Sequence, residues 1–116
     1  MQVHFFAGDL GTTVSWINGL GVGWVKQQIE WHTVEYSPGV YDWEPLDHVV
    51  DSCEAMGFKL LLGVVRAPDW LRADVLETGP PADYAEYGRF MGELAGRYKG
   101  RVAAYELWNE TNLARE

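Results

Sequence analysis

Residues 59–65 read Lys-Leu-Leu-Leu-Gly-Val-Val and form the most strongly apolar run of the chain. A helical pattern precedes this run at Glu44–Met56, and another follows it after Asp83. An uninterrupted apolar run between two helices is typical of a parallel strand that is buried on both faces. The run therefore predicts an α/β fold built on a parallel sheet.

The two flanking helices are predicted from residue spacing and from their ends. In the first helix, Pro45 stands in the first turn, where its missing N–H costs little, and Gly57 follows the last turn as a C-terminal cap. Asp83 and Glu86 form an N-capping arrangement for the second helix, which Gly100 stops. The apolar face of the first helix consists of Leu46, Val49, Val50, Cys53 and Met56.

Three further strand patterns extend this alternation along the chain, at Val3–Ala7, Trp24–Trp31 and Val102–Trp108. The result is four β–α steps, and right-handed crossovers between them would make the whole sheet parallel. Two architectures fit: a four-stranded open sheet, or half of a closed (β/α)8 barrel, which needs about 250 residues in full. We expect a single domain over residues 1–116.

Composition excludes several functions. The 116 residues carry a net charge of −8, which disfavours binding to the phosphates of nucleic acids. No apolar run approaches the ~20 residues that cross a membrane, and the first residues lack the pattern of a signal peptide, which leaves localisation open. The single cysteine, Cys53, cannot form an internal disulfide, and the histidines show no metal-ligand spacing. We therefore expect no metal and no cofactor.

The loops that follow the strands share one end of a parallel α/β fold, and functional residues gather there. Tryptophan rings stack on the C–H faces of sugars, while carboxylates and amides bind hydroxyl groups. These loops combine tryptophans with carboxylates and amides, which favours a carbohydrate cleft over a phosphate site. Each tryptophan could equally serve packing, and Glu110 could be a solvated carboxylate at a strand end. The candidates are Trp31, His32, Arg66, Trp70, Trp108, Asn109 and Glu110.

Polar residues also alternate along the strand pattern at Trp24–Trp31, and one glutamate lies inside the last strand pattern. If these side chains point into a barrel, each buried charge needs a partner. We hypothesise a buried cluster of Lys26, Gln28, Glu30 and Glu106.

Several motifs, taken together in their order along the chain, resemble those of the clan A glycoside hydrolases of families 5, 39 and 42, which are (β/α)8 barrels. They are Trp108-Asn109-Glu110, Gly23-Trp24-Val25-Lys26, Pro38-Gly39-Val40-Tyr41-Asp42-Trp43 and Ala67-Pro68-Asp69-Trp70-Leu71. The resemblance implies that Glu110 is the general acid/base and that Asn109 binds the hydroxyl next to the reacting carbon. It also implies that the remaining candidates lie in the cleft that binds the sugar.

The chain departs from the clan pattern in ways that affect function. Lys26 stands where many relatives have arginine, and Thr111 stands where proline is common. The clan's nucleophile is a glutamate after the seventh strand, and no seventh strand is found in this sequence. Glu35 is a poor substitute, because its loop follows the wrong strand.

We therefore expect four β–α units that form half of a (β/α)8 barrel. This would be the N-terminal half of a retaining glycosidase, which carries the acid/base glutamate but not the nucleophile and is inactive or very weak alone. It would be completed by a missing C-terminal half or by self-association into a dimer that closes the barrel. The alternatives are a non-catalytic, self-associating scaffold that binds carbohydrate weakly, and a small open-sheet α/β binding protein.

Overall fold

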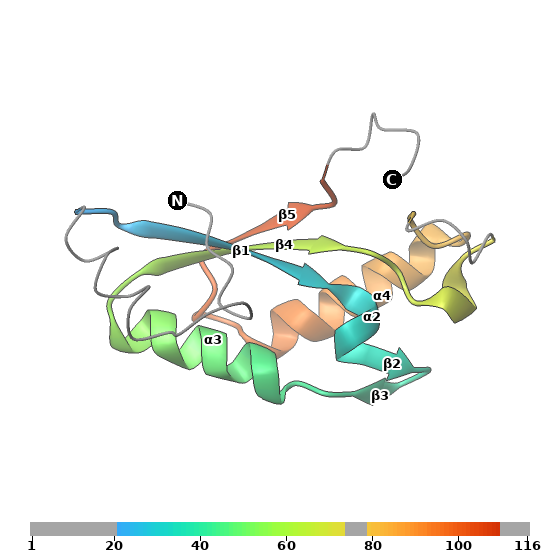
Figure 1. The fold of residues 1–116 in the computed structure, drawn as a ribbon, viewed down its shortest axis with the longest axis horizontal. Coiled ribbons are helices and arrows are strands. Elements are labelled where there is room, and N and C mark those ends of the chain that lie inside the picture. Colours follow the sequence, from blue (N-terminus) through green and yellow to red (C-terminus); the bar gives the residue numbers. More distant parts are fainter. Residues whose placement is uncertain (1–20, 74–78, 110–116) are drawn as a thin grey trace.

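A computed structural model describes residues 21–73 and 79–109 of the chain (Figure 1). The strand predicted at Val3–Ala7 and the candidate acid/base Glu110 lie outside the described residues.

A three-stranded parallel sheet is the centre of the described fold. It contains β1 (Trp24–Glu30), β4 (Lys59–Val65) and β5 (Ala104–Leu107), in the spatial order β1-β4-β5. Trp24 pairs with Lys59 at the start of the first ladder, and Leu61 pairs with Ala104 in the second. The apolar run of residues 59–65 is thus the central strand of the three, and the prediction of a parallel α/β fold is confirmed.

Both long helices lie on the same side of this sheet (Figure 1). They are α3 (Glu44–Ala55), which connects β1 to β4, and α4 (Tyr84–Arg97), which connects β4 to β5. Strands that follow one another in chain order, with helices on one face, form a singly wound sheet. A doubly wound sheet would reverse the strand order and place helices on both faces. The described residues therefore form a singly wound sheet and not a doubly wound one.

The helix ends follow the local signals of the sequence, with one difference. Pro45 lies at the start of α3, and Gly57 follows the helix with a φ of +73°, a conformation that glycine adopts without strain. The side chain of Asp83 accepts a hydrogen bond from the amide of Ala85 and caps α4. Glu86, expected to take part in this cap, instead binds Arg89 one turn along the helix.

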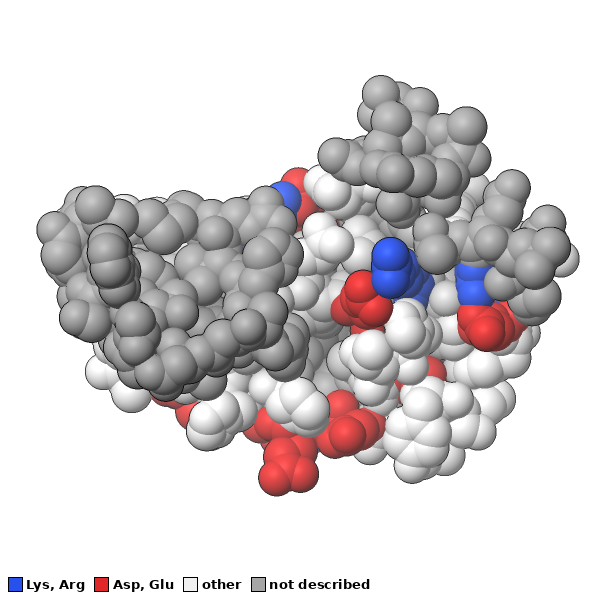
Figure 2. Space-filling view, viewed as in Figure 1, with Lys and Arg blue, Asp and Glu red and all other residues white. Residues whose placement is uncertain are grey.

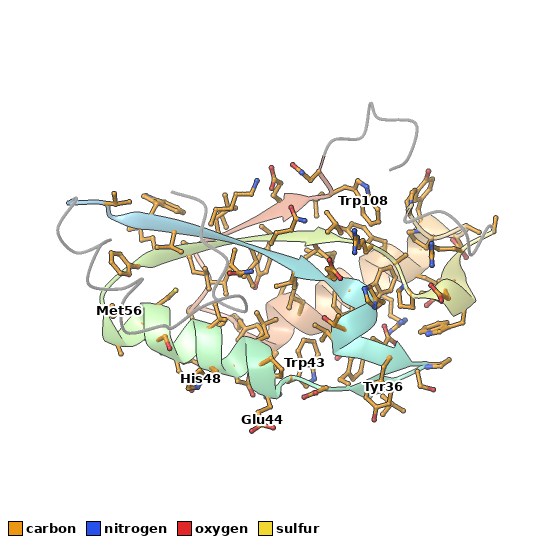
Figure 3. The ribbon with its side chains drawn as sticks, in the orientation of Figure 1. Tyr36, Trp43, Glu44, His48, Met56 and Trp108 are labelled. Atoms are coloured by element: carbon orange, nitrogen blue, oxygen red, sulfur yellow. The ribbon has the colours of Figure 1, made fainter. Side chains whose placement is uncertain are left out.

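The hydrophobic core fills the space between the sheet and the two helices. At its centre the ring of Trp31 stacks on Phe90 of α4, with 4.9 Å between the ring centroids. Figure 3 shows Trp43 on the same, helix-covered side of the sheet. The strands and helices contribute these buried apolar residues: Val25, Ile29, Leu46, Val49, Val50, Cys53, Leu60, Leu62, Val64, Phe90 and Leu94.

The segment between β1 and α3, expected to be a loop, contains regular structure. Trp31 does not end the strand but begins a one-turn helix, α2 (Trp31–Val34), which is followed by a hairpin of β2 (Glu35–Ser37) and β3 (Val40–Tyr41). Pro38 and Gly39 form the turn between these two strands, and Gly39 has a φ of +70°. After β4, a 3-10 helix, η2, covers Asp69–Leu71. Within residues 21–73 and 79–109, no helix has the length and apolar character to span a membrane.

Candidate functional site

Two residues that directly follow strands have unusual backbone conformations. Arg66 follows β4 with a φ of 54°, and Trp108 follows β5 with a φ of 67°. Residues other than glycine rarely adopt this left-handed region, at a cost of roughly 1–3 kcal/mol each, and such residues cluster at functional sites. Both residues were singled out from the sequence as site candidates. The carboxyl ends of β4 and β5 are therefore where the backbone departs most from regular structure.

A cluster of charged side chains joins the carboxyl ends of β1 and β4. One carboxylate oxygen of Glu30 lies 2.8 Å from His32 Nε2, and the other lies 3.0 Å from the guanidinium of Arg66. The amide of His32 also donates to the carbonyl of Arg66 at 3.1 Å. All three side chains are exposed enough to contact solvent. The structure thus brings together two predicted site residues and adds Glu30 as the acceptor between them.

A shallow depression of about 210 Å³ opens beside this cluster. Basic and acidic side chains adjoin on the face of the molecule seen in Figure 2. The candidate Trp70 lies nearby in sequence on η2, and its side chain is partly exposed. The residues that line the depression are His32, Arg66, Ala67, Asp69 and Arg72, of which Asp69 and Arg72 form an ion pair.

Trp31, another candidate for the sugar cleft, lies in the core instead. Its side chain is 0% exposed, between Phe90 and Tyr87 of α4, so neither ring face is open to a ligand. Its indole N–H donates to Glu35 at 2.8 Å. The ring therefore packs against the helix-covered side of the sheet, because α2 turns the chain away from the strand direction at this residue.

Glu35 is a buried structural carboxylate. It accepts hydrogen bonds from the guanidinium of Arg89 at 2.8 Å and from the amide of Gly39 at 2.9 Å, in addition to the indole of Trp31. Burial opposes ionisation of Glu35, but the hydrogen bonds from Arg89, Gly39 and Trp31 outweigh it and hold the pKa below its usual value. Its side chain is fully buried and its oxygens accept hydrogen bonds from Trp31, Gly39 and Arg89, so it is a poor second catalytic carboxylate.

The last strand carries the remaining described candidates. Trp108 lies beyond the end of β5 (Figure 3), is 8% exposed, and contacts Tyr87 edge to face with 5.7 Å between the ring centroids. Asn109 follows it and is half-buried. The burial of Trp108 shows that packing covers most of its side chain. Asn109 lies two residues beyond β5, at the same end of the sheet as Arg66, which follows β4, and His32 in α2.

The sheet face opposite the helices carries an ion pair that spans three strands. Lys26 of β1 and Glu106 of β5 are 2.6 Å apart, and both are half-buried. Between them lies Gly63 of β4, where a Cβ atom would be 2.8 Å from the Glu106 carboxylate. The hypothesised cluster thus forms only in part: Lys26 and Glu106 pair, whereas Glu30 binds His32 and Arg66. A glycine inside an apolar strand was the sequence signal for this close approach.

Within residues 21–73 and 79–109, no group of three or more histidine, cysteine, aspartate or glutamate side chains is placed to hold a metal ion.

Comparison with known proteins agrees with this fold. A beta-1,4-xylanase of Dictyoglomus thermophilum is 29% identical over 89 residues, which are 73% of this chain and 24% of the xylanase. A family 39 glycoside hydrolase from Bacteroides cellulosilyticus WH2 superposes with a TM-score of 0.78 at 24% identity, over 96% of this chain and 24% of that one. A beta-galactosidase from Marinomonas ef1 superposes with a TM-score of 0.71 at 20% identity, over 97% and 21%.

These similarities place the chain among proteins related to glycoside hydrolases. The sequence profile of glycoside hydrolase family 42, the beta-galactosidase family, matches residues 9–86, and the chain belongs to this family. The chain spans about a quarter of the length of the relatives it matches.

Proposed function

We propose that the chain supplies the acid/base side of the active site of a retaining glycoside hydrolase that acts on β-linked sugars. Glu110 is the general acid/base, and Asn109 binds the hydroxyl next to the reacting carbon. The observation that carries this proposal is the position of Asn109. It lies two residues beyond β5, at the end of the sheet where Arg66 follows the neighbouring β4 and His32 lies two residues beyond β1. The beta-galactosidase family and the xylanase relative support the choice of substrate.

The reaction needs a second carboxyl group. In retaining hydrolysis two carboxyl groups ~5–5.5 Å apart share the work: one protonates the leaving oxygen and the other attacks the anomeric carbon. Glu35 does not fit the second role, because it is fully buried and bound to Arg89. The nucleophile is therefore supplied by chain outside these 116 residues, and the isolated chain is inactive or very weak.

Completion of a (β/α)8 barrel would bring that nucleophile into place. Leu107 on β5 is 66% exposed, and β5 pairs with β4 alone among the described strands. An apolar side chain on a strand edge favours pairing with further structure. We propose that this edge is covered by the remaining half of a barrel or by a second copy of the chain. Sedimentation equilibrium at micromolar concentration tests the second case: a dimer that Leu107→Lys dissociates supports it, and a monomer excludes it.

Hydrolysis of aryl β-galactosides and aryl β-xylosides tests the role of Glu110. The chain is assayed alone and after mixing with the complementary segment of a family 42 enzyme, and Glu110→Gln is compared with Glu93→Gln, which changes an exposed carboxylate on α4. We expect hydrolysis only in the mixture, and a loss of about 10²–10⁴-fold with Glu110→Gln, the usual contribution of acid/base catalysis. Hydrolysis that survives Glu110→Gln would remove Glu110 from this role.

A second candidate function is weak carbohydrate binding without catalysis. The half-exposed Glu30, His32 and Arg66 side chains beside the depression favour it, because such groups bind sugar hydroxyls without help from Glu110. Titration of galactose and xylose, followed by NMR shifts of the Arg66 and His32 amides, tests this function. Shifts that persist in Glu110→Gln while no mixture hydrolyses the aryl glycosides would favour binding over catalysis.

A further inference from the structure

Trp108 departs from ordinary structure in three respects. Its backbone has a φ of 67°, and its amide donates to a side-chain hydroxyl, that of Tyr87. Its indole Nε1 is buried and has no hydrogen-bond partner among the described residues. Buried donors nearly always have partners, and strained backbone persists only where the surroundings hold it in place. The surroundings of Trp108 must therefore supply a specific restraint.

The hydroxyl of Tyr87 is that restraint. Tyr87 lies on α4, and its hydroxyl donates to the carbonyl of Val64 on β4 at 3.1 Å. It accepts from the amide of Trp108 at 3.2 Å. The last residues paired between these strands are Val64 and Leu107, so the hydroxyl lies between β4 and β5 where their ladder ends. One oxygen thus takes the place of a direct bond between the two strands and separates their ends.

The ring of Tyr87 is held firmly enough to serve this purpose. Its centroid lies 5.7 Å from the ring of the fully buried Trp31 and 5.7 Å from that of Trp108. Burial is the main reason that the pKa of Tyr87 is raised, with a further contribution from the charge of Glu106, against the lowering effect of the Trp108 amide. The hydroxyl therefore stays protonated and remains a donor to Val64.

We propose that Tyr87 is a positioning residue: its hydroxyl holds the ends of β4 and β5 apart and keeps Trp108 in the left-handed conformation, which sets the direction in which the chain leaves β5 at Asn109. The effect on the backbone is independent of any reaction. The catalytic consequence, correct placement of Glu110, rests on the proposed function.

Hydrogen exchange of single amides tests the backbone effect. Tyr87→Phe keeps the ring and removes the hydroxyl, and Tyr84→Phe is the matched control, because Tyr84 is 73% exposed on the same helix. We expect the Trp108 amide to exchange about tenfold faster in Tyr87→Phe, as loss of one hydrogen bond implies, and the Asn109 amide to shift in its NMR spectrum. The amide of Leu62 in β4 reports overall stability and serves to normalise the rates. The proposal would be overturned if the normalised exchange rate of the Trp108 amide were the same in Tyr87→Phe as in Tyr84→Phe.

The catalytic consequence is tested by steady-state kinetics of the chain mixed with the complementary segment of a family 42 enzyme. We expect Tyr87→Phe to lower kcat about tenfold with little change in KM, because a displaced acid/base impairs the reaction and not substrate binding. If kcat depends on Glu110 and is unchanged in Tyr87→Phe, the catalytic part of the inference is wrong. If hydrolysis does not depend on Glu110 while Trp108 responds as expected, the proposed function fails and the backbone role of Tyr87 stands.

Discussion

Removal of the buried carboxylate of Glu35 is expected to destabilise the chain strongly. In Glu35→Ala three donors lose their acceptor: the indole of Trp31, the amide of Gly39 and the guanidinium of Arg89. These donors belong to α2, to the hairpin turn and to α4, so the carboxylate connects three elements. Its loss should therefore weaken the whole packing of this end of the molecule.

The magnitude follows from the exposure of each donor. The indole of Trp31 is fully buried, and a buried donor without a partner costs about 1–3 kcal/mol. Gly39 is exposed, so water can replace the carboxylate at its amide. Arg89 is 36% exposed, and partial solvation reduces the loss of its charged hydrogen bonds to about 1 kcal/mol. The sum is a loss of about 3 kcal/mol at neutral pH, near the lower end for a broken buried ion pair.

Urea unfolding followed by circular dichroism measures this loss. Glu93→Ala on the exposed face of α4 is the control, and a change within about 0.5 kcal/mol is expected there. A loss below about 1 kcal/mol in Glu35→Ala, with an unchanged dependence on urea, would show that the carboxylate contributes no more than an exposed ion pair and would refute the reasoning.

Three further predictions concern the same core. The pKa of Glu35 in the folded chain lies below its usual value of 4.5, so its contribution to stability should be complete above pH 4.5 and be lost as the pH falls through the folded pKa. Glu35→Gln should flatten this part of the pH dependence of the free energy of unfolding, measured with urea. Burial raises the pKa of the Cys53 thiol to about 11, so modification by a thiol reagent at pH 8 should proceed only as fast as the chain unfolds, and rapid reaction in the native state would contradict the buried position. Phe90→Ala should lower the free energy of unfolding by about 3–5 kcal/mol, measured by the same method, whereas a cost below ~1 kcal/mol would mean that the stack on Trp31 is not formed.

The sheet and its helices could be predicted because their signals are local. The apolar run of residues 59–65, the proline and glycine at the ends of α3, and the aspartate before α4 each act within a few residues. The hairpin of β2 and β3 was missed, because it has only two short strands, and their position depends on contacts with Arg89, far along the chain. Local patterns contain no information about such contacts.

The site was predictable in type more than in detail. Parallel strands bring their carboxyl ends together, so His32 and Arg66 could be expected near one another. The position of Trp31 could not be foreseen, since its ring is drawn into the core by Phe90 and Glu35, which lie on other elements. Tyr87 escaped notice for the same reason: in the sequence it is one of several apolar residues at helical spacing, and only its contacts with β4 and β5 distinguish it.

The neighbour order β1-β4-β5 also has a consequence for synthesis of the chain. Within the three-stranded sheet, β4 pairs with β1 and β5 pairs with β4, so each of these two strands pairs with one that was translated earlier. Domains tend to fold from the N-terminus while the rest is still being made, at about 5–20 residues per second. β4 can therefore dock on β1 before β5 has left the ribosome, and each new strand finds its template already in place. At every stage the most recently added of these strands offers the edge on which the next one pairs.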